Sequence, residues 1–248
     1  MKKHRKFAIV FPAAMLIVAG VSAPSAAASG TLSNIVETLF GQNTDTVDII
    51  LLLTVLALLP SLLIMLTGFV RILITLSIMR NAMGTQQMPP NQVVIGLALF
   101  LTMFVMWPTL SEVYEKAYIP YTEEVISRDE FVEEAMKPIR IFMLEQTYKQ
   151  DIDFFVSYQD AEYESYEDVP NQVLIPSFLI SEIKRAFTMG FFIYIPFIVI
   201  DMIVASTLMS MGMMMLPPAM ISLPFKILMF VMVDGWQLVI GTIIQSFG

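Results

Sequence analysis

The sequence predicts an all-α, multi-pass membrane-type protein whose helices are broken by prolines. Hydrophobic residues make up 56% of the 248 residues and charged residues only 15%, with a mean hydropathy of +0.72. A soluble domain carries about 25% charged residues. The apolar residues are also gathered into four long stretches behind a short basic N-terminus. A chain of this composition is typical of proteins that fold in lipid or around a protein-lined pore.

The N-terminal residues predict a secretory signal peptide over residues 1–28. Five basic residues, Lys2 to Lys6, precede a largely apolar, uncharged run over residues 7–21. Small residues then follow at 26–28, which places the cleavage site between Ala28 and Ser29. The alternative is an uncleaved first anchor, but the apolar run is short for a membrane span.

The four apolar stretches cover residues 49–70, 93–110, 186–211 and 218–247. The first has 22 residues without a charge, enough to cross ~30 Å of hydrocarbon at about 1.5 Å per residue. Pro60, Pro196 and Pro224 lie inside these stretches. We therefore expect broken helices, which often mark transport pathways, although simple kinks in a packed bundle are the plainer alternative.

The chain behind the leader divides into three predicted parts. Residues 29–110 form an N-terminal helical part with two apolar stretches, and residues 175–248 form an apolar helical hairpin. Residues 111–174 form an acidic, solvated helical segment, expected to break at Pro120, Pro138 and Pro170. Sixteen of the 22 acidic residues lie between Glu112 and Asp168. This negative charge disfavours a nucleic-acid partner.

Charged residues between the stretches bear on orientation. A cleaved leader leaves the mature N-terminus outside the cytoplasm, so Arg71 and Arg80 are expected in a cytoplasmic loop, in accordance with the positive-inside rule. Lys184 and Arg185 would then lie outside, which the rule does not favour. A simple picture of four spans is therefore in conflict with the charges.

The residue inventory excludes most enzyme classes. The chain has no cysteine, and its one histidine, His4, belongs to the predicted leader. No glycine precedes a lysine, which excludes a P-loop. We predict no catalytic residue, no metal and no cofactor. One enzyme alternative is an intramembrane aspartyl protease in which Asp201 and Asp234 share a proton, but the glycine that such proteases carry before the aspartate is missing.

Three ionisable residues interrupt the C-terminal apolar stretches: Asp201, Lys226 and Asp234. We interpret them as buried and structural. Folding the chain back at Met213 and Met214 places Asp201 and Lys226 at equal depth, and an isolated charge in an apolar bundle is costly. The two residues are therefore predicted to pair, the alternative being that each meets a different subunit.

The most unusual local feature is a methionine-rich turn. Gly212 allows an unusual backbone angle, and Pro217 and Pro218 prevent the preceding helix from continuing. Methionine is flexible and repacks around different shapes. The run therefore favours a flexible pore seal, the alternative being a hairpin tip buried in a bundle. The predicted seal consists of Met209, Met211, Met213, Met214 and Met215.

Two blocks of the chain resemble the FliP family, the flagellar type III export-gate family that is related to an injectisome component. The C-terminal block runs from residue 175 to 238, and its matching segments are Ile175-Pro176-Ser177-Phe178-Leu179-Ile180-Ser181-Glu182, Gly190-Phe191-Phe192, Ile195-Pro196-Phe197, Ile200-Asp201, Leu208 to Met215, Ser222-Leu223-Pro224-Phe225-Lys226 and Asp234-Gly235-Trp236. The second block contains Gly84-Thr85-Gln86-Gln87, Pro89-Pro90-Asn91-Gln92-Val93 and Gly96 to Thr102. Small departures stand at Pro217, where a small residue such as serine is usual, and at Trp107, where alanine is usual. No motif matches residues 112–168.

The resemblance implies an assembly and a function. Members of the family assemble as five copies with FliQ and FliR type subunits into a helical export gate of the bacterial inner membrane, in the flagellar basal body, and seed flagellar assembly. The gate stands largely above the membrane plane, so apolar stretches would be buried against neighbouring subunits. Unfolded protein substrates pass a methionine gasket, which corresponds here to Met213, Met214 and Met215 with Met209 and Met211 adjoining. The signal peptide favours the flagellar over the injectisome branch.

Two further alternatives come from other classes of protein. A small-solute transporter would show an inverted repeat between the two halves, and none is visible. A structural scaffold without an open pore needs the same packing as a gate, so the sequence leaves that alternative open.

Overall fold

The computed structural model describes residues 54, 57, 58, 61, 64–85, 88–159, 163–213 and 215–248. The chain separates into two compact units, Met1–Leu63 and Ile64–Gly248, and the second is described below. The predicted signal cleavage site at Ala28 and Ser29 lies outside the described residues, as do Pro60 and Met214.

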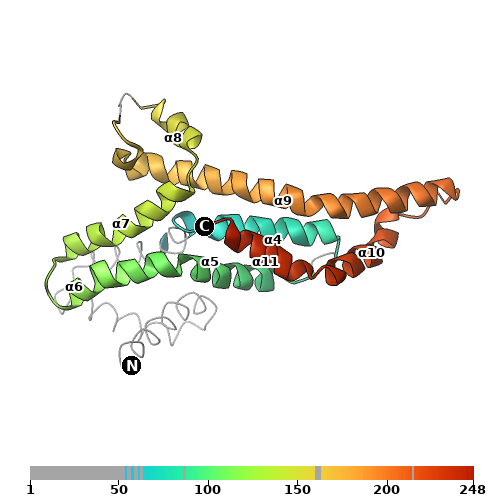
Figure 1. The fold of residues 1–248 in the computed structure, drawn as a ribbon, viewed down its shortest axis with the longest axis horizontal. Helices are drawn as coiled ribbons and strands as arrows, with labels where there is room; N and C mark the ends of the chain where they lie inside the picture. The colour runs from blue at the N-terminus through green and yellow to red at the C-terminus, as the bar shows by residue number, and fades with distance from the viewer. Residues whose placement is uncertain are drawn as a thin grey trace. The chain divides into compact units, whose positions relative to one another are not determined.

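The regular elements of the described residues are all helices (Figure 1). In chain order they are α4 (Phe69–Met83), α5 (Asn91–Val113), a π-helical turn η2 (Tyr114–Tyr118), α6 (Ile119–Thr122), α7 (Arg128–Gln146), α8 (Lys149–Val156), a 3-10 turn η3 (Tyr166–Asp168), α9 (Asn171–Ser210), α10 (Pro218–Met232) and α11 (Gly235–Gln245).

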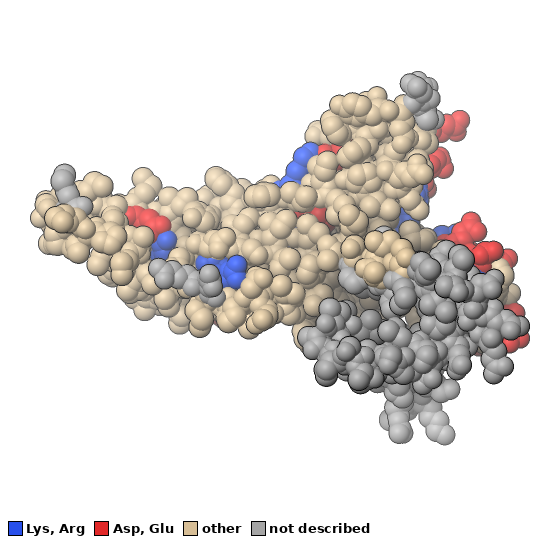
Figure 2. All heavy atoms as spheres, turned by 180° about the vertical axis from the view of Figure 1, so that it is seen from behind, with Lys and Arg blue, Asp and Glu red and all other residues tan. Residues whose placement is uncertain are grey.

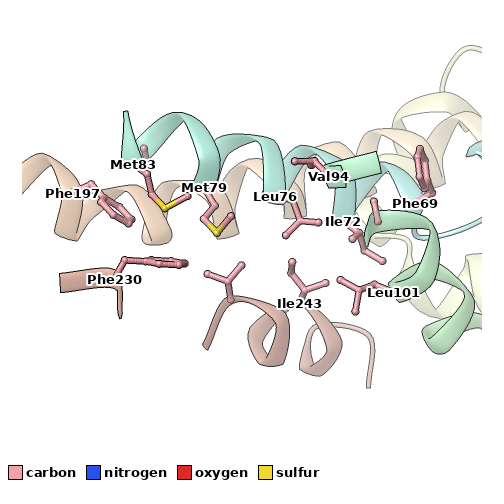
Figure 3. Close-up of a cluster of buried hydrophobic side chains, with 13 residues drawn as sticks. Phe69, Ile72, Leu76, Met79, Met83, Val94, Leu101, Phe197, Phe230 and Ile243 are labelled. Atoms are coloured by element: carbon pink, nitrogen blue, oxygen red, sulfur yellow. The ribbon is translucent and has the colours of Figure 1, made fainter. Parts of the chain in front are cut away.

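Helix α4 is the centre of the unit, in contact with α5, α9, α10 and α11. Its buried side chains Ile72, Leu76, Met79 and Met83 recur every three or four residues, which is the spacing of one helix face. Figure 3 shows them between side chains of the other four helices. The helix ends where Gly84 adopts a left-handed conformation with φ of 72°.

Arg71 and Arg80, which are expected in a cytoplasmic loop, both lie on the helix α4. Arg71 is fully buried and paired with Glu182 of α9. A basic residue that is neutralised inside the fold gives no information about loop orientation. The positive-inside rule counts charges in solvated loops, and Arg71 does not belong to one.

The chain between α5 and α9 is helical, as predicted, but its breaks differ from those expected. Pro138 lies inside α7 without ending it, and Pro120 lies in the first turn of α6. Only Pro170 marks a boundary, as the residue before α9. Helix α7 instead begins at a capping box formed by Ser127 and Glu130. The predicted part boundaries at 110 and 174 both fall within helices, α5 and α9.

The apolar helices are broken at a different place than the prolines predict. Helix α9 continues through Pro176 and Pro196 for 40 residues, and α10 continues through Pro224. The sharp break, a bend of 65°, separates α10 from α11. It falls at Asp234, whose φ of 51° and ψ of 52° lie outside the right-handed helical region. A proline removes one hydrogen bond from a helix, whereas a left-handed residue ends it.

Among the described residues, two helical segments are long and apolar enough to cross a membrane, Asn91–Thr122 and Asn171–Ser210, and a third is possible if α10 and α11 count as one bent span. The predicted stretches 93–110, 186–211 and 218–247 fall on these three segments. The prediction of an all-α, membrane-type protein is confirmed.

Candidate functional site: the methionine-rich turn

The turn between α9 and α10 closes the end of α9 by a pair of backbone hydrogen bonds. The N–H of Met213 donates to the carbonyl of Leu208 at 3.0 Å, and the N–H of Gly212 donates to the carbonyl of Met209 at 3.0 Å. This pair defines a Schellman motif, in which the residue after the helix is left-handed. Gly212 occupies that position with φ of 78°. Because a side chain there would meet no atom within 4 Å, backbone conformation rather than space calls for glycine.

The chain returns from the turn through α10 and α11, called the return arm, while α9 is the outgoing arm. The return arm begins at two prolines. Pro217 is the residue before α10, with φ of −68° and ψ of 113°, and Pro218 is the first helical residue. Proline suits the first helical position because the backbone donor that it lacks would have no partner within the helix. The sequence therefore specifies both ends of the turn, as predicted.

The methionine side chains of the turn are exposed in the single chain. The exposed fractions are 61% for Met209, 63% for Met211, 37% for Met213 and 98% for Met215. A hairpin tip buried within its own chain is therefore excluded for these four residues. Thioether side chains in water are poorly placed unless another molecule covers them.

Behind the turn, one ion pair joins the two arms. The Lys226 ammonium lies 2.6 Å from Asp201 Oδ2, which confirms the predicted pairing. The Ser222 hydroxyl donates to Asp201 Oδ1 at 2.5 Å, and Lys226 also donates to the carbonyl of Ala82 at 3.2 Å. Ala82 lies in the last turn of α4, where carbonyl groups lack helical partners and a cation is favourable. Lys226 therefore connects α10 to both α9 and α4.

Asp201 and Asp234 differ in burial from the prediction. The Asp201 side chain is 39% exposed, whereas that of Lys226 is 8% exposed. Asp234 is exposed in the single chain because it stands at the bend between α10 and α11, so the expectation of burial is wrong there. Among the described residues, no hydrogen bond or ion pair joins the two carboxylates. They do not form the proton-sharing pair that an aspartyl protease requires.

Sequence reasoning missed a second polar cluster, at the base of the arms. Arg71 and Glu182 are fully buried and form a bidentate ion pair. Burial lowers the pKa of Arg71 below its ordinary value, and the hydrogen bond and charge of Glu182 only partly oppose this shift. A signal was present in the sequence, since Glu182 is the one acidic residue between 175 and 200. A carboxylate within such an apolar stretch needs a partner.

The basic residues that conflicted with the orientation rule also have partners. Lys184 forms an ion pair with Asp151 of α8, and the Arg185 guanidinium lies 4.5 Å from the centre of the Tyr148 ring. Both side chains belong to a packed region where α8 meets α9.

Beyond this region the arms are covered by apolar side chains. Figure 2 shows few charged atoms over the part of the surface that carries the hairpin. The exposed large side chains on α9 and α10 include Phe187, Phe191, Phe192, Met202, Ile203, Phe225, Leu228, Val231 and Met232. Such a surface requires lipid or neighbouring protein.

Comparison with known proteins identifies the family. The model of the FliP family matches residues 52–243. The flagellar biosynthetic protein FliP of Bacillus subtilis is 53% identical over 204 residues, 82% of this chain and 92% of that protein. The protein of the same name from Caulobacter vibrioides is 46% identical over 244 residues, 98% of this chain and 91% of that protein. That of Pectobacterium carotovorum is 51% identical, over 84% of this chain and 81% of that protein. This chain therefore belongs to the FliP family.

Proposed function

We propose that the chain is a channel-forming subunit of the flagellar type III protein-export gate in the bacterial inner membrane, and that it seeds flagellar assembly at the basal body. The proposal assigns unfolded flagellar proteins as the substrate. One observation carries it: the methionine side chains stand exposed on a conformationally fixed turn at the end of two apolar arms. The relatives that are named flagellar biosynthetic proteins support the flagellar branch over an injectisome.

A ring of such turns closes a pore without charge. A narrow constriction lined by apolar side chains excludes water and thereby blocks ions. Methionine suits a constriction that must also open, because its unbranched side chain repacks around different substrates. The nearest charges on the arms, Asp201 and Lys226, neutralise one another behind the turn. A ring of turns would therefore present thioethers and no net charge to the pore.

The apolar arms supply the argument for partners. Their exposed aromatic and aliphatic side chains form a surface far more apolar than that of a soluble monomer. We propose that five copies of the chain cover part of this surface against one another and that FliQ and FliR type subunits cover more of it. Co-expression with these partners, followed by native mass spectrometry, tests this arrangement. A stable complex with five copies is the expected result, and a monomeric chain in the presence of the partners would contradict it.

A substrate-trapping experiment tests the channel itself. A photo-cross-linking amino acid at Met215 is expected to capture a stalled export substrate in assembled complexes. The control site is Val132, an apolar residue on the acidic α7 that is 56% exposed. Capture at 215 but not at 132 supports a substrate path past the turn. Equal capture at both sites, or none at 215 while export proceeds, would refute the channel.

A further inference from the structure

The guanidinium of Arg71 is completely satisfied inside the unit. Nε donates to Glu182 Oε2 at 3.0 Å, and Nη2 donates to Glu182 Oε1 and, at 3.0 Å, to Gln146 Oε1. Nη1 donates to the carbonyl of Ser246 at 2.7 Å and to its hydroxyl at 3.1 Å. These contacts use all five N–H donors of the side chain. The residue is fully buried, so no donor depends on water.

The acceptors come from segments far apart in the sequence. Glu182 belongs to α9, Gln146 ends α7, and Ser246 follows α11. Phe247 is held from two sides: its ring lies 3.9 Å from the Arg71 guanidinium, and its carbonyl accepts from Gln146 Nε2 at 3.1 Å. One arginine on α4 therefore holds α9 at Glu182, in the first third of that helix, and the chain just after α11 at Ser246.

The hairpin is consequently tied to α4 at two levels. At the base, Arg71 holds Glu182 and Ser246, and further toward the turn, Lys226 holds Asp201 and the carbonyl of Ala82. Both ties end on α4, which Figure 1 shows alongside α9 and α11. A rod fixed at two points along its length has a defined direction, whereas a rod fixed at one point can swing.

We infer that Arg71 is a positioning residue of the gate: it clamps both arms of the α9–α10–α11 hairpin to α4 and so determines where the methionine turn stands. The inference rests on the proposed function, and it adds a site some distance along the arms from the turn itself. The chemistry calls for arginine, because lysine carries the same charge but cannot reach a carboxylate, an amide and a carbonyl in one plane.

The test compares Arg71→Lys with Arg80→Lys in the complete complex. Arg80 lies on the same helix but outside the cluster, and its Nη1 donates to Asn91 Oδ1 at 3.5 Å. The first measurement is hydrogen exchange of the amides of Ser246 and Phe247, which donate to the carbonyls of Thr242 and Ile244. We expect about tenfold faster exchange or more in Arg71→Lys and no comparable change in Arg80→Lys.

The second measurement reports where the turn stands. Because the chain has no cysteine, Met215→Cys introduces a unique thiol at a 98% exposed position. We expect a disulfide to form between neighbouring copies in the otherwise unchanged complex. We expect this disulfide to be lost in Arg71→Lys, while the amount of complex recovered stays the same. Faster exchange at Ser246 with unchanged cross-linking would overturn the inference, since the cluster would then act only locally.

A milder variant decides the case if Arg71→Lys does not accumulate. Gln146→Met removes the acceptor for Arg71 and the donor to Phe247 but keeps the ion pair with Glu182. It is expected to give the same two changes in smaller measure, and unchanged exchange and cross-linking would overturn the inference. Failure of the proposed function is distinguishable, because a complex without a gasket would show no cross-linking at 215 even with Arg71 in place.

Discussion

The ammonium of Lys226 lies 2.6 Å from Asp201 Oδ2 and 3.2 Å from the carbonyl oxygen of Ala82, so one buried cation connects α10, α9 and α4. The two partners differ in exposure, because Lys226 is buried while Asp201 is partly open in the single chain. Removing the open partner leaves a buried charge without compensation. Removing the buried partner leaves a carboxylate that water can reach.

This asymmetry predicts unequal effects of the two neutralising changes. Asp201→Ala is expected to reduce assembly more than Lys226→Ala, because it leaves the buried Lys226 charge unpaired, whereas Lys226→Ala leaves a carboxylate that water can reach. The charge swap Asp201→Lys with Lys226→Asp should restore assembly only in part, since an aspartate at 226 cannot donate to Ala82. Recovery of the intact complex after affinity purification measures this. A swap no better than the worse single variant would contradict the pairing.

Gly212 is predicted to be required for its conformation. Gly212→Ala should destabilise the protein by about 1–2 kcal/mol, because a left-handed backbone is strained for a residue with a Cβ. Gly241→Ala is the matched control: a side chain there meets no atom within 4 Å and the residue lies inside α11, so alanine should be neutral or stabilising by up to about 1 kcal/mol. Thermal unfolding of the purified protein separates the two. Equal melting temperatures would argue against the Schellman turn.

The capping box of α7 predicts a pH dependence outside the membrane-type helices. The backbone N–H of Ser127 donates to Glu130 Oε2 at 2.7 Å, and this hydrogen bond lowers the pKa of Glu130. The pKa of Glu130 is therefore lower in the folded protein than in the unfolded chain, where it is about 4.3, and the carboxylate stabilises the helix at pH values above about 4.3. That contribution disappears as the pH falls through the folded pKa. Carboxyl chemical shifts measured against pH should show the Glu130 pKa below the ordinary glutamate value of about 4.3. Replacing Ser127 by proline, which has no backbone N–H, should raise it.

Signal cleavage remains a prediction of the sequence, because residues 1–53 lie outside the described residues. The basic, apolar and small-residue regions in order are typical of a leader that is removed. N-terminal sequencing of the membrane-inserted protein should therefore begin near Ser29. Recovery of Lys2 or Lys3 in the mature protein would show that the leader is retained as an anchor.

The features that sequence analysis predicted correctly depend on local chemistry. Gly212 and the prolines determine the turn through their own backbone preferences, and the Asp201–Lys226 pair follows from counting residues back from that turn. The break at Asp234 was missed although Asp-Gly is a dipeptide that favours turns, because prolines are the more familiar signal of a broken helix.

The Arg71 cluster could not be predicted for a different reason. Its members are separated by 75, 111 and 175 positions, and no local pattern reports which of them meet. The hydropathy pattern predicts a loop at Arg71, because a charged residue beside an apolar stretch is usually solvated. Only the packing of α4 against α9 reveals that Glu182 neutralises it.

The methionine turn is predicted to close the pore. The deciding measurement is the ion permeability of cells that express the triple variant Met213→Ala, Met214→Ala and Met215→Ala with its partners. The turn glycine and prolines remain, so the complex should assemble. The matched control replaces Met202, Met220 and Met232, which are exposed methionines on the arms. We predict that the turn variant leaks ions while the control stays tight. An assembled turn variant as tight as the unchanged complex would contradict the gasket.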